Sequence, residues 1–92
     1  MKTGRAIVLF IGRVQGVGFR FTCRSLAMGF SVTGYVENLE DGRVKLVVEG
    51  EPRETEEFLR AITESHLKPF IRQHVLEWHL STGEWKDFHI KI

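Results

Sequence analysis

The pattern of the segment "RAIVLFIGRVQGVGFRFTCRSLAM" (residues 5–28) changes twice along its length, which makes it the most informative part of the sequence about the fold. Residues 5–14 are rich in branched aliphatic side chains, which is typical of a strand buried on at least one face. Residues 19–28 have helical periodicity and are followed by Gly29, a natural helix stop. The apolar residues that share one face of this helix are Phe19, Cys23, Leu26 and Ala27. The stretch therefore predicts a strand, a glycine-rich turn and a helix.

The turn between them, "GRVQGVGFR" (residues 12–20), has the composition of an anion-binding loop. The first N–H groups of a helix have no intrahelical partners, and Gly16 and Gly18 allow the backbone to curl these groups around one tetrahedral anion. Arg20 adds a permanently charged, two-pronged donor for phosphate oxygens. The stretch lacks the Gly-Lys-Ser/Thr of a Walker P-loop, and Phe21 stands where a dinucleotide fingerprint needs its third glycine. A tight turn with a solvent-facing arginine is the alternative interpretation.

The rest of the chain continues the alternation of strands and helices. Residues 31–39 and 43–50 have strand patterns and are separated by Asp-Gly, a strong hairpin turn signal. Residues 51–65 have a proline near their start, acidic residues in the first turns and apolar residues at helical spacing, which predicts a second helix. Residues 71–92 predict a long strand, a turn and a short final strand.

These elements follow the order βαββαβ, with a small extra strand. The order predicts an α+β fold of the ferredoxin-like type, a sandwich in which two helices cover one face of an antiparallel sheet. We interpret residues 1–92 as a single domain. A chain of 92 residues with 42% apolar content can bury one core but is too short for a second.

The first strand is apolar on both of its faces, although one face of such a sheet lies away from the helices. The residues expected on this open face are Ile7, Leu9 and Ile11 of the first strand, with Tyr35 and Val47 on its neighbours. An uncovered apolar patch of this kind favours association. We therefore hypothesise weak self-association through the open sheet face, or cover of that face by the C-terminal segment.

The composition limits the classes of partner. The chain has 13 Lys and Arg against 12 Asp and Glu, so it lacks the broad positive charge of a nucleic-acid binder. No apolar stretch is long enough to span a membrane, and we expect no membrane partner. The single cysteine, Cys23, falls on the buried helix face, so we interpret it as a core residue rather than a nucleophile. The lack of a secretory signal and of a second cysteine favours a cytoplasmic location.

Two segments in the first half of the chain resemble the signature segments of the acylphosphatase family, in order and at the right separation. They are "GRVQGVGFR" (residues 12–20) and "GYVENLEDGRVKLVVEG" (residues 34–50). The resemblance implies hydrolysis of small acyl phosphates to a carboxylate and phosphate, without a metal or another cofactor. It implies two catalytic residues, Arg20 to bind the phosphate oxygens and Asn38 to position the attacking water. The N–H groups that it implies for phosphate binding are those of Gln15, Gly16, Val17, Gly18, Phe19 and Arg20.

The implied chemistry suits these residue types. A carboxylate is a good leaving group, so positioning and charge stabilisation can carry the reaction with little proton transfer. The carboxamide of Asn38 can accept a hydrogen bond from water and donate one to a phosphoryl oxygen, without adding negative charge beside an anionic substrate. A turn-forming role before the hairpin is the alternative for Asn38.

The second half of the chain departs from the family pattern. The segment "SHLKPFIRQHVLEW" (residues 65–78) replaces the usual Gly-Pro-containing connection, so the sequence does not predict the path into the fourth strand. All four histidines lie in this half. His79 and His89 are candidates for neighbours across two strands, but no cysteine or HxxxH spacing accompanies them. We therefore predict no metal site.

The alternative hypothesis is a non-catalytic acylphosphatase-like binding module for RNA, a protein or carbamoyl phosphate. Residues 16–19 faintly resemble an RNA-recognition motif, but they lie on a predicted loop rather than on a central strand with stacking aromatic residues. A carbamoyl-phosphate-handling domain, like the acylphosphatase-like module of larger hydrogenase-maturation proteins, would keep the same loop. We prefer the enzyme, because the sequence has no zinc-finger cysteines.

Overall fold

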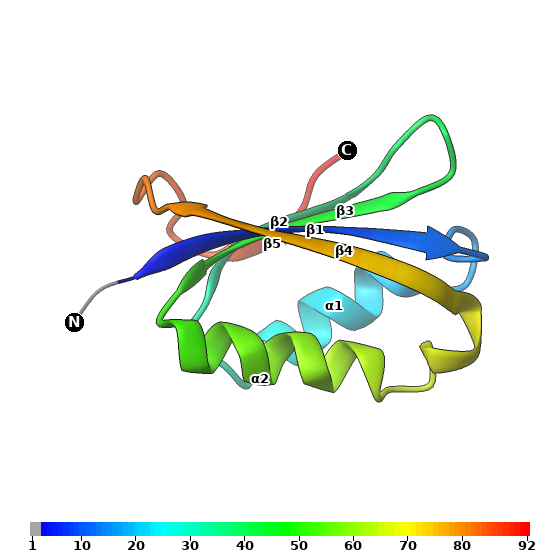
Figure 1. Ribbon diagram of the computed structural model, residues 1–92, viewed down its shortest axis with the longest axis horizontal. Coiled ribbons are helices and arrows are strands. Elements are labelled where there is room, and N and C mark those ends of the chain that lie inside the picture. Colours follow the sequence, from blue (N-terminus) through cyan, green and yellow to red (C-terminus); the bar gives the residue numbers. More distant parts are fainter. Residues whose placement is uncertain (1–2) are drawn as a thin grey trace.

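The computed structural model describes residues 3–92 and contains the helices and strands expected from the sequence (Figure 1). In chain order the elements are β1 (Gly4–Gly12), α1 (Phe19–Ala27), β2 (Thr33–Asn38), β3 (Val44–Gly50), α2 (Pro52–Thr63), a 3₁₀ helix (Lys68–Phe70), β4 (Ile71–Leu80) and β5 (Phe88–Ile90). The patterns that predicted the two helices and the hairpin therefore placed them correctly.

The five strands form one sheet in the order β4-β1-β3-β2-β5. The four longer strands pair antiparallel, and both helices cover the same face of the sheet (Figure 1). This arrangement confirms the predicted ferredoxin-like α+β sandwich. The small extra strand is β5, which pairs parallel with β2 and makes the sheet mixed at that edge.

The core lies between the sheet and the helices. Ala6, Val8 and Phe10 form the inward-facing row of β1, and none of them is exposed to solvent. The Phe19 ring of α1 packs against the Phe10 ring with 4.9 Å between their centroids, and Phe58 of α2 is fully buried. Burial of a side chain of this size contributes about 1.5–3 kcal/mol, so these contacts fix α1 and α2 against the sheet.

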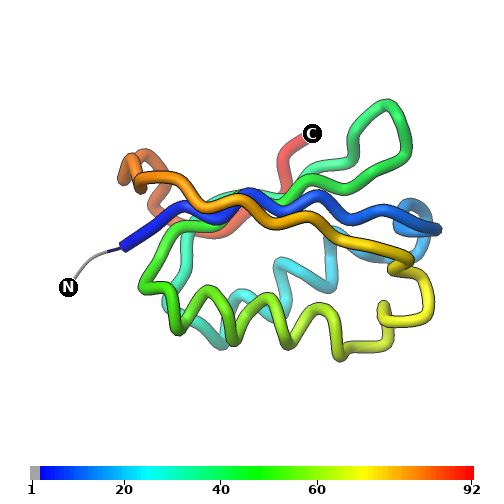
Figure 2. The backbone as a smooth tube through the Cα atoms, in the orientation of Figure 1, coloured from blue at the N-terminus to red at the C-terminus, as the bar shows by residue number. Residues whose placement is uncertain are grey.

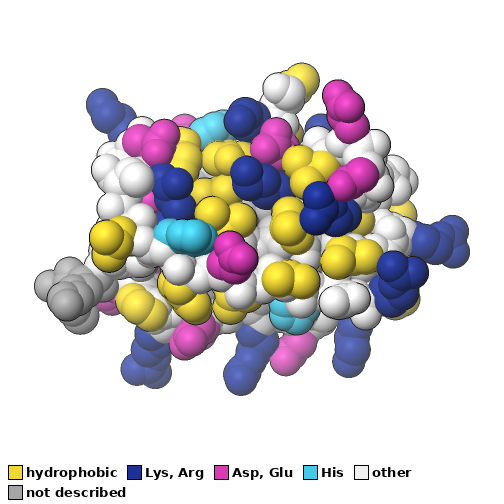
Figure 3. All heavy atoms as spheres, turned by 45° about the horizontal axis from the view of Figure 1, so that its top comes forward, with side chains coloured by type: hydrophobic (Ala, Val, Ile, Leu, Met, Phe, Trp, Pro, Cys, Tyr) yellow, Lys and Arg dark blue, Asp and Glu magenta, His cyan; other side chains and the backbone are white. Residues whose placement is uncertain are grey.

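Apolar side chains lie at the surface of the opposite face of the sheet (Figure 3), but part of this face is less exposed than the sequence suggests. The half-buried residues of its β1 row are Ile7, Leu9 and Ile11. Val47 exposes only 2% of its surface, so the prediction that it is uncovered is wrong. Ile7 and Tyr35 flank Val47 on the neighbouring strands, and the ring of Trp85 packs edge-on against Tyr35 with 5.5 Å between centroids. The C-terminal segment thus covers part of this face.

Trp85 belongs to a segment, residues 81–87, that we call the strap. It leads from β4 at one edge of the sheet to β5 at the other, across the end where β1 begins (Figures 1 and 2). The Arg5 guanidinium lies over the Trp85 ring, 4.7 Å from its centroid. The carbonyl of Asp87 accepts a hydrogen bond from the Gly34 N–H at 2.9 Å, which attaches the far end of the strap to β2.

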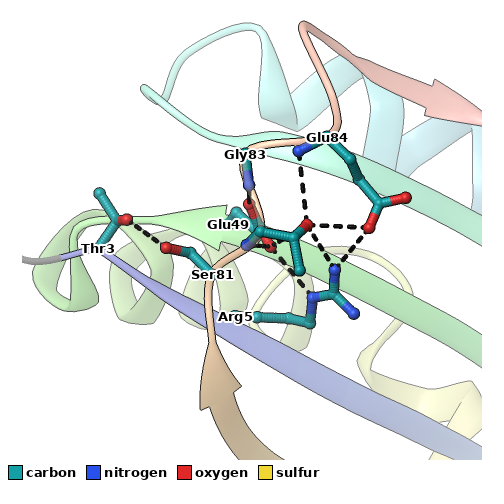
Figure 4. A network of polar contacts seen from close by, with 7 residues as sticks. Thr3, Arg5, Glu49, Ser81, Gly83 and Glu84 are labelled. Carbon is teal, nitrogen blue, oxygen red and sulfur yellow. Dashed lines mark hydrogen bonds and ion pairs between the residues drawn. The ribbon is translucent and has the colours of Figure 1, made fainter.

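Glu49, which is 5% exposed, holds the other end of the strap. Its carboxylate accepts hydrogen bonds from the backbone N–H groups of Thr82 at 2.7 Å and Gly83 at 2.9 Å. The Nε of Arg5 donates to the same carboxylate at 3.0 Å, and Arg5 Nη2 donates to Glu84 at 2.8 Å (Figure 4). Burial by itself raises the pKa of Glu49, but the hydrogen bonds from Thr82, Gly83 and Arg5 hold it below its ordinary value.

The connection from α2 runs through the 3₁₀ helix into β4, an edge strand that is exposed along almost all of its length. Its pairing with β1 is interrupted near the start. Ile11 pairs with Gln73, whereas Gly12 pairs with Ile71. Arg72 is therefore the extra residue of a β-bulge.

The histidines of β4 and β5 lie apart, because these strands occupy opposite edges of the sheet. His79 and His89, which were candidates for neighbours across two strands, are therefore not neighbours. The Nε2 of His79 lies 3.3 Å from Glu77, and the Nδ1 of His89 lies 3.2 Å from Asp87. Across residues 3–92, no three His, Cys, Asp or Glu side chains are grouped to hold a metal ion. None of the helices described above has the length and apolar character needed to cross a membrane.

Candidate functional site

The predicted anion loop connects β1 to α1, at the end of the sheet that also carries the β2–β3 hairpin (Figure 1). It bends at Gly16 and Gly18, whose φ angles of 78° and 79° lie in the left-handed region that favours glycine. A Cβ at either position would meet no atom within 4 Å, so backbone conformation rather than space requires these glycines. Val14 and Phe19 are buried and anchor the two ends of the bend.

The loop presents backbone N–H groups that have no partner. Within residues 3–92, the N–H groups from Gln15 to Arg20 donate no backbone hydrogen bond, and α1 begins with a bond from Thr22 N–H to the Gly18 carbonyl at 2.9 Å. The helix has neither a side-chain N-cap bond nor an acidic residue in its first turn. Its N-terminus therefore keeps an uncompensated partial positive charge, which favours a bound anion.

Arg20 lies in the first turn of α1 and is half-buried. Its guanidinium forms no ion pair or hydrogen bond with the rest of the described chain. Together with Gly16, Gly18 and Asn38, it lines a hollow of about 320 Å³. The structure thus brings a free guanidinium, the loop glycines and a carboxamide to one place.

Asn38 is the last residue of β2 and pairs with Val44 of β3. Its Oδ1 atom is buried and accepts no hydrogen bond from residues 3–92. An unpaired buried acceptor costs about 1–3 kcal/mol, which a hydrogen bond from a water or a ligand would recover. Its alternative role as a turn former is not what the structure shows. The Asp41 carboxylate accepts the Arg43 N–H bond at 3.1 Å within the turn, and Asn38 remains in the strand.

Gln15 connects the loop to this hairpin through its side chain. Its Nε2 donates hydrogen bonds to the carbonyls of Leu39 at 2.8 Å and Arg43 at 3.0 Å. Because Leu39 directly follows Asn38, the contact fixes the position of the Asn38 strand end relative to the loop. The sequence pattern indicated only the backbone N–H of Gln15 and gave no signal for this bridging role of its side chain.

The implied phosphate-binding residues do not all line the hollow. Those that do are Gly16, Gly18, Phe19 and Arg20. Val17 packs its side chain against the core, and the Gln15 side chain is directed to the hairpin. For these two residues only the backbone N–H groups remain available to an anion.

Four apolar residues that were not predicted from the sequence complete the hollow. They are Val14, Phe21, Ile90 and Ile92. Phe21 is 68% exposed. The sequence carries a signal for this exposure, because Phe21 directly follows Arg20 and does not belong to the apolar face of the helix. Ile90 belongs to β5, and Ile92 lies beyond it and is exposed. Their place beside Asn38 depends on the parallel pairing of β5 with β2, which no local pattern indicates.

Cys23 takes no part in the hollow. It is fully buried in the core, and burial raises the pKa of its thiol well above the ordinary value. A thiol with a raised pKa is protonated at neutral pH and is a poor nucleophile. This agrees with its interpretation as a core residue.

Comparisons with known proteins agree with the geometry. Residues 6–90 match the family model described as Acylphosphatase. An acylphosphatase from Roseiflexus sp. (strain RS-1) is 38% identical over 90 residues, which covers 98% of this chain and 97% of the relative.

Solved structures give the same result. The crystal structure of an acylphosphatase from Bacillus subtilis superposes with a TM-score of 0.88 at 27% identity, covering 97% of this chain and 99% of that one. A full-length HypF in a phosphate- and nucleotide-bound form superposes with a TM-score of 0.81 at 28% identity. That match covers 98% of this chain but only 12% of the HypF chain.

Proposed function

This chain belongs to the acylphosphatase family, whose activity is the hydrolysis of small acyl phosphates, and from that premise we propose that residues 15–20 and Asn38 carry out the reaction here. One observation carries the proposal. A guanidinium without a protein partner, left-handed glycines and a carboxamide with an unpaired oxygen line the same hollow.

Phosphate binding is the first part of the proposed mechanism. The unpaired N–H groups from Gln15 to Arg20 surround the phosphate, and the fork of the Arg20 guanidinium binds two of its oxygens. These donors stabilise the charge that develops on the phosphoryl oxygens during transfer. Because they are held by the buried anchors of the loop, little reorganisation is needed when the substrate binds.

Orientation of the nucleophile is the second part. The Asn38 oxygen accepts a hydrogen bond from a water molecule and aligns it opposite the bond that breaks. A bond forms between the water oxygen and phosphorus, and the bond between phosphorus and the acyl oxygen breaks. Its electron pair leaves with the carboxylate, and the proton of the water passes to solvent or to phosphate. An ideally positioned reactant can lower the barrier by about 7–11 kcal/mol.

The apolar rim of the hollow indicates which acyl groups fit. Phe21 and Ile92 are exposed at this rim, so they can contact the substituent of an acyl phosphate whose phosphate lies in the loop. Their apolar surfaces favour an aromatic or aliphatic substituent over a charged one. Benzoyl phosphate is therefore a suitable test substrate.

The experiment measures two properties of one folded Asn38→Ala sample, the affinity for inorganic phosphate by calorimetric titration and the hydrolysis rate with benzoyl phosphate. We expect near-parental affinity with a loss of turnover of several orders of magnitude. Gln73→Ala, which removes an exposed carboxamide from β4, serves as the matched control and should behave like the parent.

Three outcomes would contradict the proposal. Near-parental turnover in Asn38→Ala would exclude the water-orienting role. Loss of phosphate affinity together with rate would make Asn38 a binding residue. A parent chain that binds phosphate without hydrolysing benzoyl phosphate would favour the alternative binding module.

We also propose that the single domain acts in the cytoplasm, because its one cysteine is free and buried.

We further propose weak self-association through the open sheet face. Half-buried Leu9 of β1 pairs with Val75 of β4, which is 41% exposed, so apolar surface remains uncovered where these two strands lie side by side. Sedimentation velocity over a range of protein concentrations tests the association. A monomer at every concentration would contradict it.

A further inference from the structure

A second and larger hollow lies at the same end of the sheet, and the proposed mechanism does not use it. It measures about 620 Å³, which is within the usual range for small-molecule sites. Its walls come from the end of β1, the β2–β3 turn and the segment that leads into β4, and it shares no lining residue with the first hollow. The residues that carry the argument are Ile11, Arg13, Asp41, Arg43, Phe70 and Arg72.

The β-bulge shapes this hollow. Gly12 has a φ of 141°, and a Cβ there would lie 2.3 Å from the Phe70 carbonyl oxygen and 2.8 Å from the Arg72 nitrogen. Only glycine therefore allows the two strands to approach so closely at this point. The Arg13 N–H donates to the same Phe70 carbonyl at 2.9 Å, which joins the end of β1 to the segment before β4.

The bulge also redirects Arg72. In a regular ladder Arg72 would pair with Gly12, two residues beyond the pair of Phe10 with His74, and its side chain would point to the helix side. Because Gly12 pairs with Ile71 instead, Arg72 lines the hollow. Ile11, which belongs to the open face of the sheet, lines the same hollow. Bulges that redirect a side chain are common beside binding sites.

The charges in the hollow are unbalanced. It contains three arginines and one carboxylate, that of Asp41. Asp41 is already engaged, since its Oδ2 accepts from Arg43 Nε at 2.9 Å, and this hydrogen bond holds the pKa of Asp41 below its ordinary value. Arg13 and Arg72 form no ion pair within residues 3–92. In Figure 3, Lys and Arg side chains lie at the right-hand end of the molecule as well as along its other edges.

We infer that this hollow binds a small molecule that carries at least two phosphate groups. The guanidinium forks of Arg13 and Arg72 match phosphate oxygens, and Arg43 supplies a third cation that its own carboxylate only partly neutralises. Phe70 and Ile11 offer an apolar surface to the rest of the ligand. The site is distinct from the candidate phosphate loop.

The test is calorimetric titration with pyrophosphate at constant ionic strength. All proteins in it carry Arg20→Ala, which weakens the contribution of the candidate phosphate loop equally in every sample. In this background Arg13→Ala/Arg72→Ala should raise the dissociation constant by about tenfold or more, because two charge-assisted contacts are lost. Arg24→Ala/Arg53→Ala removes the same charge from exposed positions elsewhere and should leave the dissociation constant almost unchanged. Replacement of Arg13 and Arg72 by Lys keeps both charges and should weaken binding less.

Each contrary result overturns a defined part of the inference. If Arg20→Ala alone abolishes pyrophosphate binding, the loop is the only site. If both double variants weaken binding equally, the effect is general charge rather than a site. If citrate binds as tightly with the same dependence on Arg13 and Arg72, the ligand is not specifically a phosphate compound. Benzoyl phosphate hydrolysis by Arg13→Ala/Arg72→Ala with Arg20 intact should equal that of the parent, so failure of the proposed function would be seen separately.

Discussion

The two ends of the sheet both carry arginines, and they use them in opposite ways. Where β1 begins, the fork of Arg5 is filled by Glu49 and Glu84, and its plane lies over Trp85. Where β1 ends, Arg20 stands beside unpaired backbone N–H groups and has no carboxylate partner in the described chain. A filled fork stabilises the fold, whereas an empty one beside a cradle of donors is available to an anion.

The strongest test of this difference compares alanine substitutions of the two arginines, which should affect activity and stability in opposite proportions. Arg20→Ala should lower kcat/KM for benzoyl phosphate by about 100-fold or more, because a donor to the developing charge is lost, with little change in the free energy of unfolding. Arg5→Ala should lower the free energy of unfolding and leave kcat/KM for benzoyl phosphate almost unchanged. Initial rates and urea unfolding curves for both variants measure this. A parental rate for Arg20→Ala would mean that the loop is only a turn.

Removal of the charge on Glu49 should have the next largest effect. Glu49→Gln replaces a carboxylate that accepts from Arg5, Thr82 and Gly83, and it should lower the free energy of unfolding by about 1.5–3 kcal/mol, the range for hydrogen bonds to charged groups. Urea denaturation at neutral pH gives the value. Glu56→Gln, at an exposed position of α2, is the control, and equal losses in the two variants would contradict a special role for Glu49.

A smaller effect should appear in the pH dependence of stability. The folded-state pKa of Glu49 lies below its unfolded value, so its contribution is complete above the unfolded pKa of about 4.3 and is lost as the pH falls through the folded pKa. The parent should therefore lose more stability than Glu49→Gln between about pH 6 and pH 3. Parallel pH profiles for the two proteins would show that Glu49 has no shifted pKa.

The smallest expected effect is that of a chelator. Arg20 and the loop N–H groups supply the positive charge that a metal ion supplies in many phosphoryl transfers. An excess of EDTA should therefore leave the rate of benzoyl phosphate hydrolysis unchanged. Inactivation that a divalent cation reverses would contradict the proposed mechanism.

The sequence predicted those parts of the fold that local patterns determine. The branched aliphatic residues of positions 5–14 predicted a buried strand, and Val8 and Phe10 of that strand lie in the core. Helical spacing identified Phe19 and Cys23 as buried. Non-local contacts escaped it. Val47 is buried between Ile7 and Tyr35 of the neighbouring strands, and Tyr35 itself packs against Trp85, which is distant in sequence. No periodicity within β3 carries that information.

The same division applies to the candidate site. Gly16, Gly18 and Arg20 lie within one short stretch, so their place at a strand-to-helix turn could be predicted. The bridge from the Gln15 side chain and the redirection of Arg72 depend on pairing between segments far apart in the chain. A bulge differs from a regular ladder by one residue of register, and register is decided by both strands together.

The strap has a consequence for local opening of the molecule. Glu49 holds Thr82 and Gly83 at one end of the sheet, only a few residues before β5, whose Ile90 forms a wall of the candidate site at the other end. In hydrogen exchange, the amides that secure β5 and those that secure the strap should therefore report one cooperative opening with a shared free energy. Protonation of the Glu49 carboxylate, which lies at the other end of the sheet from the candidate site, would then loosen the wall formed by Ile90 without changing any residue that touches phosphate.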